Sequence, residues 1–345
     1  MVSPPFPDDV PTHPLLVIDY ELLKAGDVSE TERLWEAARK LGFWYLKNHG
    51  VEEEASRMFE MGEETMSLPL EEKMKYEQGD DGRSSGYKAA GSGIVDASAE
   101  QGDTMEFINV SKDDALAYPN VVHRTYPSTV NARMDSTITP FVTKSVQVNN
   151  TILEVLNDKL ELPRGTLTEL HSKDEHSGSE ARVTKSLAGH APDRLALGAH
   201  TDFGSLTFLH NRLGGLQVLP PGYTEWQYVK PVPGHAICNI GDALSLFSGG
   251  VLRSNLHRVI PPPGPQSHLE RWSLVFFTRP RNSVVLRALV EDSSLVSEAV
   301  HNGRWKNFES GETAKEWFGR RVKYQRLNNQ VGPETWKASR GTENE

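Results

Sequence analysis

The chain has 345 residues and only one cysteine, Cys238, so it cannot form an internal disulfide bond. Nothing in it therefore requires an oxidising compartment. It has no run of about 18 apolar residues that could cross a membrane, and its proline-rich start, MVSPPFPDDVPTHP, lacks a basic and apolar leader. Together these absences predict a cytoplasmic protein.

Positive charge is also scarce. Lysine and arginine total 37 against 47 acidic residues, which gives a formal charge of −10. Such a surface repels phosphate backbones and anionic lipid. We therefore expect neither nucleic acid nor a membrane as a partner, and the sequence leaves the oligomeric state open. Hydrophobic residues make up 37% of the chain, which is enough to bury a substantial core.

The first third of the chain mixes strands and helices. Apolar strands are expected at 15–20 and 43–46, and a helix between them is expected to begin at a capping box of Ser29 and Glu32. The segment 80–103 is rich in glycine, serine and aspartate, which predicts a long mobile loop.

Beyond residue 180 the pattern changes to short apolar runs separated by glycine, proline and asparagine. Many short strands bounded by turns are typical of a sandwich or barrel, so the fold class is α+β or mainly β. We divide the chain into four regions: an N-terminal region (1–125), backing helices (126–180), a β-rich catalytic core (181–300) and a C-terminal tail (301–345) that is expected to pack against the outside.

One short motif indicates a metal site. His200 and Asp202 end an apolar run, and in a strand residues two apart point to the same face. His257 lies in another predicted strand, SNLHRVI. Two histidines and one carboxylate on a single face are the ligand set of non-haem Fe(II) oxygenases. The His-x-Asp motif alone is weak, because most such pairs are polar surface residues.

A second feature strengthens this interpretation. Arg271 opens the apolar strand RWSLVFFTR, and Ser273 shares its face. An unpaired buried guanidinium is strongly disfavoured, so a carboxylate partner is expected, and arginine pairs with carboxylates in a specific bidentate geometry. The hydroxyl of Ser273 could donate a further bond.

These features together resemble the iron- and 2-oxoglutarate-dependent dioxygenases of the isopenicillin N synthase-like superfamily. The resemblance covers most of residues 15–280 and includes FWYLKNHGV, LPLEEKMKY, HTDFGSLTFL, GGLQV and NIGDALSLFSGGVLRSNLHRV. It implies a double-stranded β-helix, or jelly roll, preceded by a layer of helices and strands. The predicted strands after residue 180 agree with this fold.

The resemblance also implies roles for individual residues. His200, Asp202 and His257 would be the catalytic iron ligands, and Arg271 with Ser273 would hold the distal carboxylate of 2-oxoglutarate. With dioxygen as the other co-substrate, such an enzyme releases succinate and carbon dioxide. It would hydroxylate, desaturate or cyclise a small-molecule metabolite, as in secondary metabolism.

One position departs from the family pattern. Many relatives have a tyrosine about fifteen residues before the first histidine, where this chain has Lys185 and Ser186, although Arg182 matches the strand arginine of the family. The anion contact of that tyrosine is lost, moved to Lys185 or replaced by water, and a changed substrate pocket is expected. The candidate substrate-contacting residues are Arg182, Lys185, Tyr87, Phe107 and Asn109.

Two other functions are consistent with the same residues. An oxidase of the isopenicillin N synthase type would use the iron without 2-oxoglutarate, and Arg271 would then hold the organic substrate. A non-catalytic binding module is the third possibility, but it would have no chemical reason to keep three metal ligands and the arginine. The segment from Asn239 to Asp242 is interpreted first as a turn, because glycine and aspartate suit one, and as part of the site only by analogy with the family.

Overall fold

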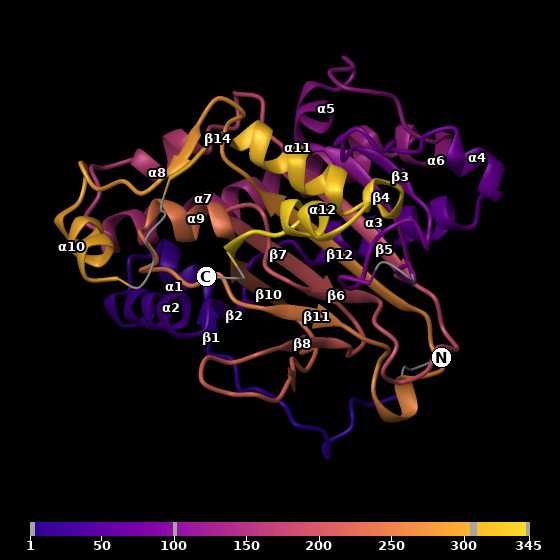
Figure 1. Cartoon of the computed structure of the whole chain (residues 1–345), viewed down its shortest axis with the longest axis horizontal. Coiled ribbons are helices and arrows are strands. Elements are labelled where there is room, and N and C mark those ends of the chain that lie inside the picture. The colour runs from indigo at the N-terminus through magenta and orange to yellow at the C-terminus, as the bar shows by residue number, and fades with distance from the viewer. Residues whose placement is uncertain (1–3, 99–101, 304–308, 343–345) are drawn as a thin grey trace.

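The computed structural model describes residues 4–98, 102–303 and 309–342. Two β-sheets face one another, and helices cover the outside of the larger sheet (Figure 1). The two faced sheets confirm the predicted double-stranded β-helix. In the described part of the chain, no helix is both long and apolar enough to span a membrane.

The larger sheet has eight strands, and all but one of its neighbouring pairs are antiparallel. In spatial order the strands are β1 (Val17–Asp19), β2 (Phe43–Lys47), β10 (His235–Ile240), β7 (Leu206–Asn211), β12 (Arg271–Thr278), β5 (Glu180–Ser186), β4 (Met105–Ser111) and β3 (Gly86–Lys88). The sheet thus contains strands from both sides of the boundary expected at residue 125.

The smaller sheet has four strands and carries the predicted metal ligands. In spatial order they are β6 (Leu197–His200), β11 (His257–Val259), β8 (Leu216–Val218) and β9 (Gln227–Tyr228). A separate antiparallel pair consists of β13 (Val285–Arg287) and β14 (Glu309–Thr313).

Most helices surround the larger sheet. The helices of the described residues are α1 (Tyr20–Lys24), α2 (Val28–Lys40), α3 (Glu52–Met66), α4 (Leu70–Met74), α5 (Lys112–Ala117), α6 (Ser128–Asn131), the π-helix η1 (Met134–Ile138), α7 (Thr139–Lys159), α8 (Thr166–Leu170), α9 (Asp242–Phe247), the 3₁₀ helix η2 (Gly264–Gln266), α10 (Ser294–Asn302), α11 (Ala314–Tyr324), the 3₁₀ helix η3 (Leu327–Asn329) and α12 (Pro333–Ala338).

Two apolar cores hold these layers together. The larger lies between the helices and the eight-stranded sheet, and α7 contributes an apolar stripe to it that includes Phe141, Ile152 and Leu156. The smaller core fills part of the space between the sheets and includes Phe43 and Val218. Burial on both sides fixes the larger sheet, so its strands are a rigid support for side chains that face the smaller sheet.

The structure differs from the sequence-based expectations at two places in the N-terminal region. Helix α2 is capped by Asp27, whose carboxylate accepts a hydrogen bond from the backbone N–H of Glu30 at 2.9 Å, so the predicted Ser29 capping box was wrong. The segment 80–103 contains β3 and therefore is not one continuous loop, while its residues 99–101 lie outside the described residues. Its mobility stays a prediction.

Candidate active site

The three predicted metal ligands meet at one end of the smaller sheet. His200 is the last residue of β6 and lies opposite His257, the first residue of β11. Asp202 follows two residues after His200, so its side chain returns to the same face. Its Oδ1 lies 3.7 Å from Nε2 of His200 and 3.6 Å from Nε2 of His257. The pairing of β6 with β11 therefore brings the two histidines together, and the spacing of two residues places Asp202 beside His200.

Hydrogen bonds around the group aim its donor atoms inward. Nδ1 of His200 lies 2.8 Å from the Gly198 carbonyl, and Nδ1 of His257 lies 3.2 Å from the Asn255 carbonyl. Because a carbonyl only accepts, each Nδ1 carries the proton and each Nε2 presents a lone pair to the centre. Such carbonyl contacts are the usual way in which metal-binding histidines are oriented.

Asp202 is oriented in the same way. Its Oδ2 accepts hydrogen bonds from Thr207 and, at 2.7 Å, from the amide of Asn239. Oδ1 is thereby left for the centre of the group. The first interpretation of Asn239, as part of a turn, was wrong, because Asn239 lies in β10 and its amide donates to this carboxylate.

The electrostatics of the group suit a cation. Burial lowers the pKa of His200 to about 3, and His257 adds to this effect. Burial opposes ionisation of Asp202, but His257 and His200 outweigh it and lower the pKa of the carboxyl group below its ordinary value. Burial lowers the pKa of His257, yet Asp202 outweighs burial and the net shift is upward. At neutral pH the site thus presents a carboxylate and a neutral His200.

The spacing also fits a first-row divalent ion. Ligand atoms about 2.1 Å from such an ion are at most about 4.2 Å apart, and the two nitrogen–oxygen distances of 3.7 and 3.6 Å lie below that limit. Two histidines and one carboxylate on one side leave the opposite coordination positions open. The donor set therefore fits Fe(II) with room for two further reactants.

Arg271 and Ser273 lie on β12 of the larger sheet and line the same cavity. The Arg271 side chain is buried, and its Nε donates to the Gly214 carbonyl at 2.8 Å. Burial lowers the pKa of Arg271 to about 10. No carboxylate of the described residues forms an ion pair with it. Directly opposite Arg271 in the ladder, Ser186 has a buried hydroxyl that finds no hydrogen-bond partner in the described part of the chain.

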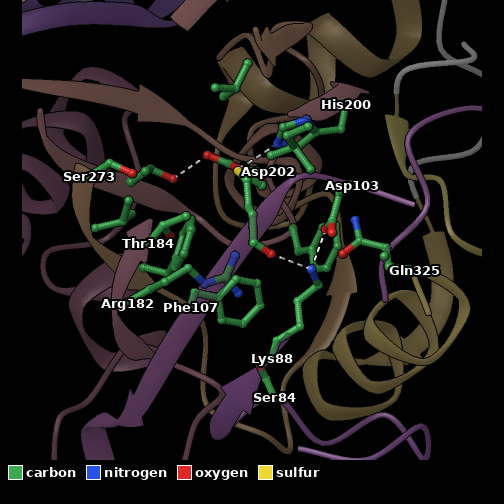
Figure 2. A pocket seen from close by; sticks show the side chains of 18 of the residues that line it. Ser84, Lys88, Asp103, Phe107, Arg182, Thr184, His200, Asp202, Ser273 and Gln325 are labelled. Atoms are coloured by element: carbon green, nitrogen blue, oxygen red, sulfur yellow. Dashed lines mark hydrogen bonds and ion pairs between the residues drawn. The ribbon is translucent and has the colours of Figure 1, made fainter. Parts of the chain in front are cut away.

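A cavity of about 150 Å³ connects these groups (Figure 2). Arg182 lines it, and the carbon of its guanidinium lies 4.1 Å from the centroid of the Phe107 ring, which lines it too. Thr184 adds a hydroxyl on the same strand. On the other side of the view, Gln325 belongs to the residues that follow α11. The cavity thus has one polar end at the metal ligands and an aromatic and cationic wall.

Three of the expected substrate-contacting residues do not line this cavity. Lys185 points away from it and forms an ion pair with Glu270 at 2.8 Å, because neighbours of an inward-facing strand residue face outward. The hydroxyl of Tyr87 donates to Glu106 at 2.6 Å. Asn109 accepts a 2.7 Å hydrogen bond from Nε of Arg182, so it orients a cavity residue without lining the cavity itself.

The C-terminal segment differs most from expectation. It does not merely pack against the outside, because Phe318 and Val322 of α11, together with Gln325 and Arg326, line the cavity. Figure 1 shows α11 and α12 lying over the strands. The many charged residues of this segment did not indicate that it lines the cavity.

A second group of one aspartate and two histidines lies elsewhere. Asp113 accepts from His123 at 3.0 Å and from His176 at 3.2 Å, and Lys112 pairs with its other oxygen at 2.9 Å. The side chains of the two histidines are 39% and 67% exposed. Because a lysine already neutralises the carboxylate, these contacts are explained as a hydrogen-bonded surface cluster.

Family models match both halves of this architecture. Residues 178–280 match the 2OG-Fe(II) oxygenase superfamily, and residues 15–130 match the model of the non-haem dioxygenase in morphine synthesis N-terminal region. The 2-oxoglutarate-dependent dioxygenase frbH of Dothideomycetidae sp. (strain 11243) is 30% identical over 282 residues, which cover 80% of this chain and 84% of that protein. The chain belongs to the 2OG-Fe(II) oxygenase superfamily, and it is a non-haem iron, 2-oxoglutarate-dependent dioxygenase.

Other relatives span the family. A 1-aminocyclopropane-1-carboxylate oxidase of Dictyostelium discoideum is 27% identical and covers 84% of this chain and 90% of its own length. The crystal structure of a full-length Neurospora crassa protein in complex with α-KG has a TM-score of 0.72 at 20% identity and covers 92% of this chain and 97% of that one. At this identity the structural likeness concerns the fold alone.

Proposed function

We propose that His200, Asp202 and His257 bind the Fe(II) of this dioxygenase, and that Arg271 and Ser273 bind the distal carboxylate of 2-oxoglutarate. One observation carries the proposal. The inward-facing donors of the triad share a single cavity with a buried guanidinium that has no carboxylate partner among the described residues. An anionic co-substrate that also reaches the metal would satisfy both groups.

Bound iron supplies the coupling of dioxygen reduction to oxidative decarboxylation of 2-oxoglutarate and oxidation of the organic substrate. The residues of this chain hold the reactants in place. Asn239 and Thr207 keep Asp202 Oδ1 directed at the metal. The hydroxyl of Ser273 lines the cavity beside Arg271 and offers a further donor to the carboxylate. The buried hydroxyl of Ser186 lies opposite Arg271 in the ladder.

The organic substrate is proposed to be a small molecule with an anionic group and an apolar body. Glu180 is the carboxylate that forms ion pairs with both Arg182, at 3.3 Å, and Arg279, at 3.2 Å, so this wall has one more positive charge than it has negative partners. Phe107 and Phe277 flank Arg182 and provide apolar surface. The Neurospora crassa protein has also been crystallised with α-KG and thymine, and thymine is likewise a small molecule.

The formal charge of −10 supports the exclusion of nucleic acid and membrane as partners, and the single buried cysteine suits a reducing compartment such as the cytoplasm.

Product analysis tests the assignment. Purified protein with Fe(II), ascorbate, dioxygen and 2-oxoglutarate should release succinate slowly even without the organic substrate. His257→Ala should release no succinate. The control is Arg258→Lys, which changes a side chain of the same strand that does not line the cavity, and it should release succinate at the wild-type rate. Succinate release by His257→Ala at the wild-type rate would refute the assignment of the ligands.

A further inference from the structure

We propose that the C-terminal segment positions the iron ligands through a clamp formed by Trp317, Arg321, Arg340 and Thr342. The proposal rests on the proposed function, because it needs His200 and Asp202 to be metal ligands. In it, Arg321 acts as a positioning residue and touches neither metal nor substrate.

The first observation concerns the backbone around the two ligands. After β6 ends at His200, residues 201–204 belong to no strand, so their carbonyl groups have no ladder partners. Side chains from the C-terminal segment bind the backbone here. Arg340 donates to the Ala199 carbonyl at 2.6 Å, Arg321 to the Thr201 carbonyl at 3.2 Å, and Trp317 to the Phe203 carbonyl at 3.3 Å. The carbonyl groups of the three residues that alternate with His200 and Asp202 thus all accept hydrogen bonds from the C-terminal segment.

Asp242 joins the clamp to the same stretch of chain. Its backbone N–H donates to the Asp202 carbonyl at 2.8 Å, and its carboxylate pairs with Arg321 in an ion pair whose two side chains are both 0% exposed. The hydroxyl of Thr201 donates to that carboxylate at 3.0 Å, and the hydroxyl of Thr342 does so at 2.6 Å. Thr201 lies between the two ligands, so its side chain points away from the metal and into the clamp.

The packing leaves this network no freedom to shift. The guanidinium carbon of Arg321 lies 3.9 Å from the centroid of the Phe203 ring, and a Cβ at Gly341 would collide with both Asp242 and Arg321. A buried ion pair contributes little net stability, because desolvation offsets much of its Coulomb attraction. A geometric role accounts for its presence better than a stabilising one does.

Helix α11 also faces the cavity with Phe318 and Val322. One helix therefore forms part of the substrate pocket and, on an adjacent face, holds the backbone that presents the metal ligands. The segment completes the iron site although it contributes no ligand to it.

The test measures metal affinity apart from turnover. Arg321→Lys keeps the charge beside Asp242 but lacks the planar fork that also reaches the Thr201 carbonyl. Loss of such outer-shell contacts typically weakens metal affinity tenfold to a hundredfold. In titrations of the metal-free chain with Co(II), we expect a dissociation constant raised by about tenfold and an altered visible spectrum, with an unchanged melting temperature.

The matched control is Arg320→Lys, the same change one residue earlier in the same helix. Its guanidinium binds Glu312 and the Ala338 carbonyl and lies 5.0 Å from the centroid of the Trp317 ring. In the described part of the chain it donates to no carbonyl beside the iron ligands, so Arg320→Lys should bind Co(II) like the wild type. Trp317→Phe keeps an aromatic side chain, though a smaller one, and removes the donor to the Phe203 carbonyl. It should weaken Co(II) binding by a smaller factor, and it replaces Arg321→Lys in the test if that variant does not fold.

The outcomes separate the two proposals. If the wild type binds one Co(II) and His257→Ala binds none, the ligand assignment holds. If Arg321→Lys and Trp317→Phe then show the wild-type constant and spectrum, the clamp is refuted while the ligand assignment stands. A wild-type chain that binds no Co(II) overturns both.

Discussion

Replacing Arg271 with lysine is the sharpest test of the co-substrate site. Arg271 is 2% exposed, its Nε donates to the Gly214 carbonyl at 2.8 Å, and its side chain shares a face with Ser273. Lysine keeps the positive charge but offers a point charge in place of a planar fork. One charge-assisted hydrogen bond of about 1.5–3 kcal/mol should be lost. The dissociation constant for 2-oxoglutarate should rise roughly tenfold to a hundredfold.

Calorimetric titration of 2-oxoglutarate into the Co(II)-loaded protein measures this constant without turnover. Arg258→Lys is the control, because that guanidinium donates to Gln217 at 2.8 Å and packs over Trp226 away from the cavity. An unchanged constant for 2-oxoglutarate in Arg271→Lys would refute the assignment. If the organic substrate then bound more weakly, Arg271 would hold the substrate, as in the oxidase alternative.

The remaining predictions concern stability and the other site residues. Arg271→Met removes a buried cation that has no carboxylate partner among the described residues, so the ligand-free chain should unfold at the same or a higher temperature. The variant should lose the stabilisation that 2-oxoglutarate gives the wild type, which is about 2.7 kcal/mol at a ligand concentration of a hundred times the dissociation constant. A melting temperature of the ligand-free variant several degrees below that of the wild type would contradict this. Lys185→Ala should leave the kinetic constants for 2-oxoglutarate and the organic substrate unchanged, because Lys185 faces away from the cavity. Arg182→Met should impair oxidation of the organic substrate and spare uncoupled succinate release. Impaired substrate oxidation in Lys185→Ala together with normal oxidation in Arg182→Met would contradict the placement of both side chains. Burial lowers the pKa of His171 to about 4 and that of His210 to about 3. Unfolding returns both to about 6.5, so the unfolded chain binds more protons below that pH, and the free energy of unfolding should fall as pH drops from about 6.5 towards 4. His210→Phe should make this fall shallower by about 1.4 kcal/mol per pH unit in urea titrations, and an unchanged slope would show that His210 is not buried in its neutral form.

Local periodicity was sufficient to predict much of the active site. The His-x-Asp alternation requires two side chains on one face of a strand, and the same rule places Arg271 with Ser273. The same rule orients Lys185 away from the cavity, because it is three residues from the cavity-lining Arg182, and the expectation that Lys185 contacts the substrate overlooked this alternation. Short strands bounded by turns likewise predicted the mainly β core.

Strand β4 shows why another part of the fold could not be predicted. All seven of its residues are buried, so apolar and polar residues do not alternate along it and no period of two is visible. Its neighbours in the sheet, β3 and β5, come from segments that are far apart in the sequence. The strand is recognised only once those neighbours are in place.

Only the tertiary structure decided which residues surround the metal ligands. Asn239 reaches Asp202 from a strand of the opposite sheet, and Arg321 pairs with Asp242 from a helix near the C-terminus. The partner of a buried polar group is chosen by the packing of whole layers, and no local pattern in the sequence encodes it. The sequence by itself determined the donors of the site, and the fold determined what holds them in position.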